Sequence, residues 1–201
     1  MWRLRVILIG VALALAACEG SPSNQPSENG GDIVGTETTS GGEIAVADRG
    51  RVERTAEIYS AVVRQLVEED HTFGEGPSPF ERIFIVDGAV QQANDPGLPR
   101  EPPRSFWPEV RAGILEELAD LPPVEFLTDP DSVIVGEKQC AHVKGNGVLI
   151  TLGPISGGED RATVPNGLFF ACLGGQWLTY KLEQTGGHWQ VAGTKGPYVI
   201  S

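Results

Sequence analysis

The chain has 201 residues, with 27 Asp or Glu against 15 Lys or Arg, and its formal net charge is −12. A surface with this excess of negative charge repels phosphate backbones and anionic lipid headgroups. The composition therefore argues against nucleic-acid binding and against membrane attachment through a basic patch.

The first predicted segment is a secretion signal, residues 1–17. Arg3 and Arg5 precede an uncharged apolar stretch, which ends in the small-residue sequence Leu15-Ala16-Ala17-Cys18. A basic region, an apolar region and a small-residue cleavage site in this order are typical of signal peptides. The apolar stretch is shorter than the roughly 20 residues that a membrane-spanning helix needs. We therefore expect the segment to be removed and not to remain as an anchor.

The sequence Leu15-Ala16-Ala17-Cys18 resembles the lipobox of bacterial lipoproteins. In such proteins the cysteine thiol is alkylated with diacylglycerol, and cleavage leaves this cysteine as the new N-terminus. The resemblance implies a lipid on Cys18 that anchors the exported chain to the outer face of the cell membrane or to another envelope membrane. The alternative is an ordinary cysteine at the end of a signal. Cleavage would leave 13 cations against 27 acidic side chains, a charge of −14.

Residues 18–50 are predicted to form the lipidated N-terminus and a disordered tether. The segment is rich in Ser, Pro, Asn, Gly, Thr and Glu, and it has few large apolar side chains. Such a composition cannot bury enough surface to offset the entropy lost on ordering. A flexible tether of this length has a root-mean-square reach of roughly 30 Å, so it would leave the lipid and the folded domain mechanically uncoupled.

Two amphipathic helices are predicted in the first part of the domain, which spans residues 51–201. In the first, residues 51–70, apolar side chains recur at spacings of three and four. The second, residues 108–120, begins at Pro108, which is favourable in a first helical turn, and it ends before a proline pair. Between the helices, residues 82–88 predict a short buried strand, and the prolines of residues 89–108 predict a surface loop.

From Val124 onward the chain changes to β-strand character. Five or six apolar segments are separated by turns that contain Gly, Asp or Pro. They comprise residues 124–127, 132–135, 147–152, 168–172, 177–182 and 189–192. Polar and apolar side chains alternate along 177–182, as in an antiparallel sheet that is covered on one side. The predicted fold is α+β, with two N-terminal helices packed on a C-terminal antiparallel meander sheet.

Several short motifs in the domain resemble a group of uncharacterised exported bacterial proteins, many with lipoprotein signals. The motifs are Ile58-Tyr59, Val86-Asp87-Gly88, Leu173-Gly174-Gly175-Gln176-Trp177-Leu178-Thr179-Tyr180 and the closing run from Trp189 to Ser201. The resemblance covers most of residues 51–201. It implies a shared domain and a shared location, and it carries no activity.

Cys140 and Cys172 are the two cysteines that remain once Cys18 is lipidated. Outside the reducing cytoplasm such a pair predicts a disulfide. The bond requires the two Cα atoms to lie about 4.4 to 6.8 Å apart. The alternative is a metal or nucleophile site in Cys140-Ala141-His142, although this motif lacks further ligands at a suitable spacing.

The other residues that could be catalytic or bind a metal have ordinary structural explanations. His71 with Asp87 or Glu69 has the residue types of a base and its orienting carboxylate, but no flanking catalytic signature accompanies it, and a capping or surface histidine is the alternative. Asp129 and Asp131 lack the remaining positions of a calcium loop and are typical of a turn. We therefore predict no catalytic residue, no metal site and no cofactor.

Two functional hypotheses follow from the sequence. The first is a membrane-anchored envelope lipoprotein, held by the lipid on Cys18, whose domain binds a partner protein, a small ligand or cell-wall material without catalysis. The second is an extracytoplasmic hydrolase with a site in the cleft between helices and sheet. A nucleophile or acid within hydrogen-bond reach of His71 or His142 would favour the enzyme, whereas an apolar cavity with a few polar groups would favour binding.

Overall fold

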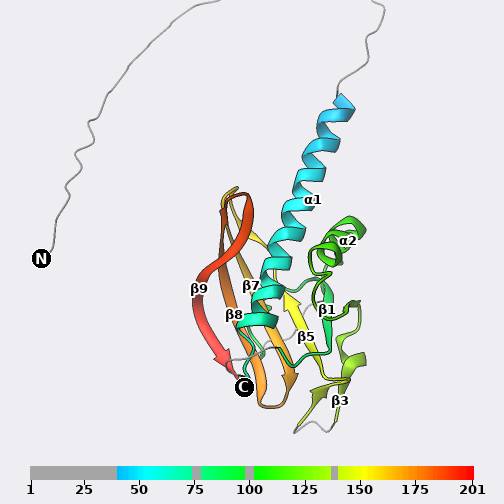
Figure 1. Cartoon of the computed structure of the whole chain (residues 1–201), viewed down its shortest axis with the longest axis vertical. Helices are drawn as coiled ribbons and strands as arrows, with labels where there is room; N and C mark the ends of the chain where they lie inside the picture. Colours follow the sequence, from blue (N-terminus) through cyan, green and yellow to red (C-terminus); the bar gives the residue numbers. More distant parts are fainter. Residues whose placement is uncertain (1–39, 74–77, 98–101, 137–139) are drawn as a thin grey trace, which may run out of the picture. The chain divides into compact units, whose positions relative to one another are not determined.

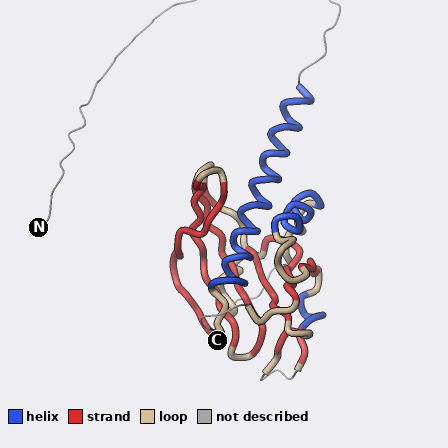
Figure 2. Tube along the Cα trace, in the orientation of Figure 1, coloured by secondary structure: helices blue, strands red, loops and turns tan. Residues whose placement is uncertain are grey.

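The computed structural model describes residues 40–201 except 74–77, 98–101 and 137–139. The predicted secretion signal, Cys18 and residues 19–39 of the predicted tether lie outside the described residues. The described part has a mixed α/β structure, in which helices stand against one large sheet (Figure 1, Figure 2).

Helix α1 runs from Ser40 to Arg64 and continues as a π-helical turn, η1, from Gln65 to Glu69. The apolar stripe predicted for this helix is buried, and Ile58, Val62, Val63 and Leu66 are fully inaccessible. The helix extends into residues that composition alone assigns to the tether. Each residue added to an existing helix contributes one more backbone hydrogen bond, so a packed helix can propagate into a polar segment.

The second helix, α2 (Pro108–Glu117), begins at the predicted proline and contributes the buried residues Val110 and Ile114. One β-strand, β1, precedes this helix in the chain, and the strands β2 to β9 follow it. Their bounds are β1 (Arg82–Ala89), β2 (Val124–Leu127), β3 (Ile134–Val135), β4 (His142–Val143), β5 (Gly147–Leu152), β6 (Ser156–Gly157), β7 (Arg161–Ala171), β8 (Gly174–Thr185) and β9 (His188–Ile200). A short 3-10 helix, η2 (Pro130–Val133), precedes β3.

The sheet contains both parallel and antiparallel pairs. Strands β5, β7, β8 and β9 are successive antiparallel neighbours, whereas β1 is parallel to both β2 and β5. The prediction of an antiparallel meander is therefore correct for β7, β8 and β9 and wrong around β1. The physical reason is the connection from β1 to β2, which passes through α2 and returns the chain to the same end of the sheet.

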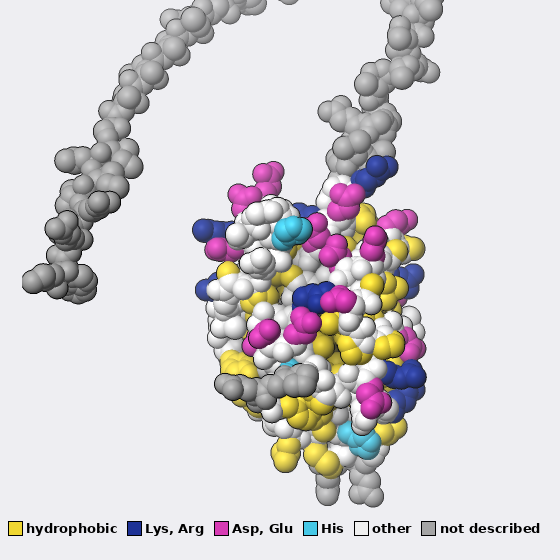
Figure 3. All heavy atoms as spheres, in the orientation of Figure 1, with side chains coloured by type: hydrophobic (Ala, Val, Ile, Leu, Met, Phe, Trp, Pro, Cys, Tyr) yellow, Lys and Arg dark blue, Asp and Glu magenta, His cyan; other side chains and the backbone are white. Residues whose placement is uncertain are grey.

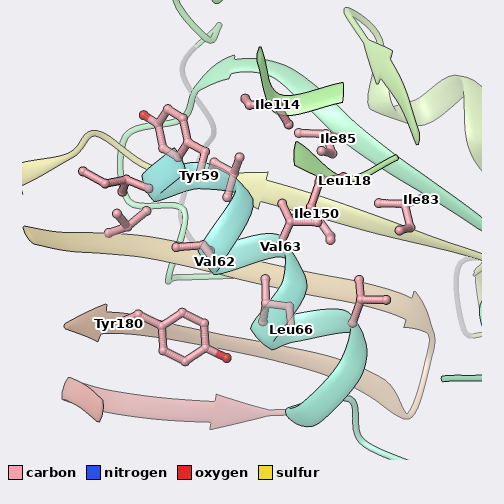
Figure 4. Packing of buried hydrophobic residues seen from close by; sticks show 14 of the residues in the cluster. Tyr59, Val62, Val63, Leu66, Ile83, Ile85, Ile114, Leu118, Ile150 and Tyr180 are labelled. Atoms are coloured by element: carbon pink, nitrogen blue, oxygen red, sulfur yellow. The ribbon is translucent and has the colours of Figure 1, made fainter. Parts of the chain in front are cut away.

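The main core lies between the helices and one face of the sheet. Figure 4 shows Tyr59, Val62, Val63 and Leu66 of α1 and η1 directed toward sheet residues such as Ile150. Along β1, Ile83 and Ile85 face this core, while Phe84 and Val86 belong to a second, smaller cluster. This alternation is the period of two that a strand with both faces buried requires.

Candidate functional site

A cavity of about 600 Å³ lies where β1 and β5 end beside α1. We call it the strand-end cavity. It is bounded by Thr55 and Tyr59 of α1, by Ala89 and Gln91 after β1, by Pro102 and Arg104 of the following loop, and by Pro154 and Ile155 after β5. Because β1 and β5 are parallel, their carboxyl ends meet at one edge of the sheet, which is where open α/β sheets bind ligands.

The two hydroxyl groups of this cavity are used within the fold. Tyr59 Oη donates a hydrogen bond to the carbonyl of Gly153 at 3.1 Å, and Thr55 Oγ1 donates to the carbonyl of Arg51 at 2.7 Å. Burial raises the pKa of the Tyr59 phenol above its usual value. Tyr59 therefore stays neutral at ordinary pH, and its proton is committed to a backbone oxygen.

The remaining two polar side chains are available to a ligand. Within the described parts of the chain, Arg104 has no salt-bridge partner and Gln91 makes no side-chain hydrogen bond. Arg104 is held in place through its backbone, since Ala89 N donates to its carbonyl oxygen at 3.2 Å. A guanidinium and an amide beside an apolar wall can bind a carboxylate or a phosphate.

A glycine makes this arrangement of the loop possible. Gly88 has φ +134°, and a Cβ at this position would lie 2.3 Å from the carbonyl oxygen of Arg104. Any other residue would push the Arg104 backbone away from β1. The glycine of the motif Val86-Asp87-Gly88 thus lets the backbone of Arg104 lie directly against β1.

Asp87 lies immediately before this glycine and is almost fully buried. Its carboxylate pairs with Arg111 of α2 at 3.2 Å, and its second oxygen, Oδ1, has no hydrogen-bond partner among the described residues. The partner of Asp87 is therefore Arg111 and not His71, the pairing considered from the sequence. The ion pair joins β1 to α2.

The two histidines that were considered as catalytic candidates lie outside the strand-end cavity. His71 is buried, and its ring lies 6.0 Å from that of Phe73 and 6.4 Å from that of Phe80. His142 lines a separate cleft of about 370 Å³, whose apolar side includes Phe80 and Phe170. Neither histidine lines the strand-end cavity.

The structure joins Cys140 and Cys172 in a disulfide, the pairing that the sequence predicts, with the Cα atoms 4.7 Å apart. A sulfur in a disulfide is not available as a thiolate. The alternative of a metal or nucleophile site at Cys140-Ala141-His142 is therefore contradicted. Cys18, the predicted lipid attachment site, lies outside the described residues.

The remaining candidates are structural. The Asp129 carboxylate accepts a hydrogen bond from Asp131 N at 3.1 Å and caps η2, as turn chemistry predicts. Among the described residues, no group of three or more His, Cys, Asp or Glu side chains is placed to hold a metal ion. Likewise, no helix in the described part is both long and apolar enough to cross a membrane.

Arg104 and Gln91 belong to no motif that could be recognised from the sequence. Both follow the first strand in a segment that composition marks only as a proline-rich loop. The signal that could have pointed to this segment is Gly88, because a glycine within a buried strand can indicate a close backbone approach. Comparison of the chain with protein-family models, with curated proteins and with solved structures yields no significant match.

Proposed function

We propose that this chain is an exported bacterial lipoprotein of α+β fold whose domain binds a small ligand with an anionic group in the strand-end cavity. The lipid on Cys18 would hold the domain at the outer face of a membrane. The observation that carries the ligand proposal is the pair Arg104 and Gln91, two polar groups that line the cavity and are not used within the described part of the fold.

The size of the cavity supports binding of a small molecule. Ligand pockets have volumes of about 300 to 1,000 Å³ and combine apolar walls with a few fixed polar groups, and this cavity of about 600 Å³ combines prolines and Ile155 with Arg104. The commitment of the Tyr59 proton to Gly153 favours binding over catalysis, because this phenol is not poised to transfer a proton.

The disulfide between Cys140 and Cys172 supports export. Such bonds persist in oxidising compartments and are rare where glutathione and thioredoxin keep thiols reduced. Together with the lipobox resemblance of residues 15–18, this favours the location that the exported lipoprotein family implies.

The ligand proposal is tested with the full chain purified in detergent. Citrate and inorganic phosphate serve as probes, and thermal unfolding measures their stabilising effect. We expect both probes to raise the Tm of the wild type and not of Arg104→Ala. Arg161→Ala is the matched control, since this exposed arginine pairs with Glu183 away from the cavity. An equal rise in Tm for Arg104→Ala, or no rise for the wild type, would refute an anion site here.

The anchor is tested separately by metabolic labelling with a palmitate analogue. The wild type should carry the label, whereas Cys18→Ala should remain unprocessed or be released without label, because alkylation of this thiol precedes cleavage. Label retained on Cys18→Ala would show that another residue carries the lipid.

A further inference from the structure

A second candidate site lies on the opposite side of α1, toward β9. Two adjoining hollows of about 200 and 310 Å³ share Ala61, Arg64 and Trp189. We call them together the α1–β9 groove. The other lining residues are Glu57, Ser60, Gln65, Glu68 and Glu69 of α1 and η1, Glu117 of α2, and His188, Gln190 and Val191 of β9.

The floor of the groove is a stripe along α1. Glu57, Ser60, Arg64 and Glu68 follow at spacings of three and four, so they share one face of the helix. Ala61 leaves room beside the large Trp189 ring. Figure 3 shows acidic side chains beside a basic one over the C-terminal half of α1.

The positive charge of Arg64 is compensated locally. It pairs with Asp120 at 2.7 Å and with Glu68 at 3.3 Å, and it also donates to the carbonyl of Glu117. The hydrogen bond between Arg64 and Asp120 raises the pKa of Arg64 and lowers that of Asp120. Both ions therefore remain charged and paired at ordinary pH.

Two carboxylates of the smaller hollow are not compensated in this way. Glu57 and Glu117 both line the smaller hollow, and neither has an ion-pair partner in the part of the chain that the structure describes. Ser60 lines the same hollow and is only 5% exposed. Its hydroxyl Oγ is buried without a hydrogen-bond partner among the described residues. An unpartnered buried hydroxyl is uncommon, because its desolvation is unfavourable unless a hydrogen bond replaces water.

The aromatic wall of the groove also suits a cation. The guanidinium of Arg54 lies 4.9 Å from the centre of a Trp189 ring. The indole face therefore already attracts a positive charge within the fold. Trp189 lines both hollows, so a bound cation would lie beside the same electron-rich side chain.

From these contacts we propose that the α1–β9 groove binds an alkylammonium group, the cation of polyamines and of lysine side chains. An ammonium has three N–H donors and no acceptor. Glu57, Glu117 and the Ser60 hydroxyl supply acceptors for these donors, and Trp189 supplies an apolar and electron-rich wall for the alkyl chain.

The test is isothermal titration of the full chain in detergent at low salt, with spermidine and with a lysine-containing tripeptide blocked at both ends. Glu57→Gln and Glu117→Gln should each weaken spermidine binding about tenfold, because each removes a charge-assisted hydrogen bond. Ser60→Ala should weaken it about fivefold. Glu53→Gln is the matched control, an exposed glutamate of the same helix that does not line the groove.

The result of each titration either supports or overturns the proposed alkylammonium site. Binding of spermidine alone assigns the site to polyamines, and binding of both probes assigns it to alkylammonium groups in general. No binding of either probe at millimolar concentration, or an equal loss of affinity in Glu53→Gln, overturns the site. Unchanged affinity in Glu57→Gln and Glu117→Gln does the same. Arg104→Ala should bind spermidine normally, so this result is independent of the strand-end cavity.

Discussion

Asp70 shows how a single residue resolves an electrostatic conflict at the end of a helix. The negative end of a helix dipole disfavours acidic side chains, yet α1 and η1 end in Glu68, Glu69 and Asp70. The Asp70 carboxylate accepts a hydrogen bond from Tyr180 Oη at 2.6 Å and another from Gln65 Nε2 at 3.2 Å. These donors stabilise its charge and fix the end of the helix to β8.

Tyr180→Phe should lower the free energy of unfolding by about 1.5 to 3 kcal/mol, the value of a hydrogen bond to a charged group. Tyr180 is fully buried, so no water can replace its hydroxyl. Urea unfolding measures the change. Tyr198→Phe is the control, because this more exposed tyrosine also loses a bond, to Gln176 Oε1 at 2.9 Å, but water can replace it. Equal losses in the two variants would contradict the role of Asp70.

Stability should also fall at alkaline pH. Burial, followed by the hydrogen bond to Asp70, raises the pKa of Tyr180 well above its usual value. A group whose pKa is raised on folding stabilises the protein fully below its unfolded pKa of about 10 and loses this contribution as the pH rises further. The free energy of unfolding should thus decrease above pH 10, by roughly 1.4 kcal/mol per pH unit for each such tyrosine. Tyr180→Phe should show a shallower decrease, and an unchanged slope would be evidence against this cause.

At the level of elements, two glycines of the helix pair should respond in opposite ways to alanine. Gly50 of α1 has no atom within 4 Å of the position of a Cβ, whereas a Cβ on Gly113 of α2 would lie 2.8 Å from Ala56. Gly50→Ala should stabilise by up to about 1 kcal/mol through helix propensity. Gly113→Ala should destabilise by about 1 to 3 kcal/mol, because α2 must move away from α1. Thermal unfolding measures both, and stabilisation by Gly113→Ala would mean that the two helices do not pack this closely.

The disulfide joins the end of β7 to the segment before β4, across a sequence separation of 32 residues. Closing a loop of this length should stabilise the folded state by about 3 to 4 kcal/mol on the chain-entropy model. The double variant Cys140→Ser and Cys172→Ser should lose this amount in urea unfolding under non-reducing conditions. Added reductant should then affect the wild type and leave the double variant unchanged. Sensitivity of the double variant to reductant would point to another cause.

The strands show which local sequence patterns are enough to predict a β-strand and which are not. The alternating residues 177–182 correctly predict the central part of β8, because one face of that strand is buried and the other is more exposed. The first half of β7 was not predicted, since Pro165, Asn166 and Gly167 interrupt the apolar pattern. These residues are tolerated because β7 is held by several neighbouring strands, a tertiary effect that a short sequence window does not contain.

For the whole molecule, the sheet carries a core on each face, and both cores should belong to one cooperative unit. Leu66 lies in the helix-side core and Leu127 in the smaller core on the other face. Leu66→Ala and Leu127→Ala should each destabilise by about 2 to 5 kcal/mol. The double variant should lose the sum within about 0.5 kcal/mol, because the two sites share no partner. A biphasic unfolding curve for either variant would show that the two faces unfold separately.

Each of the two candidate sites is formed by elements that lie far apart in the sequence, and no short sequence motif defines either site. The strand-end cavity combines α1, the loop after β1 and the segment after β5, whose residues lie far apart in the sequence. The α1–β9 groove likewise needs Trp189 beside Ser60. Periodicity identifies a helix or a strand, but it does not indicate which distant element lies next to it. The sequence therefore predicted both helices, most of the longer strands and the disulfide, whereas both sites required the fold.

The π-helical turn η1 has a consequence for the effect of insertions and deletions. Asp70 N donates to the carbonyl of Gln65 at 2.8 Å, five residues back, so this turn holds one residue more than an α-helical turn. Each residue of an α-helix rotates the chain by about 100°. Deleting one residue between positions 65 and 69 would leave a regular α-helical turn closed by the same two groups, so Asp70 should keep nearly its present direction, whereas a deletion in the regular part of α1 would rotate the chain by about 100°. The π turn is therefore the one turn described in this helix where the loss of a residue should leave the contact between Asp70 and Tyr180 in place.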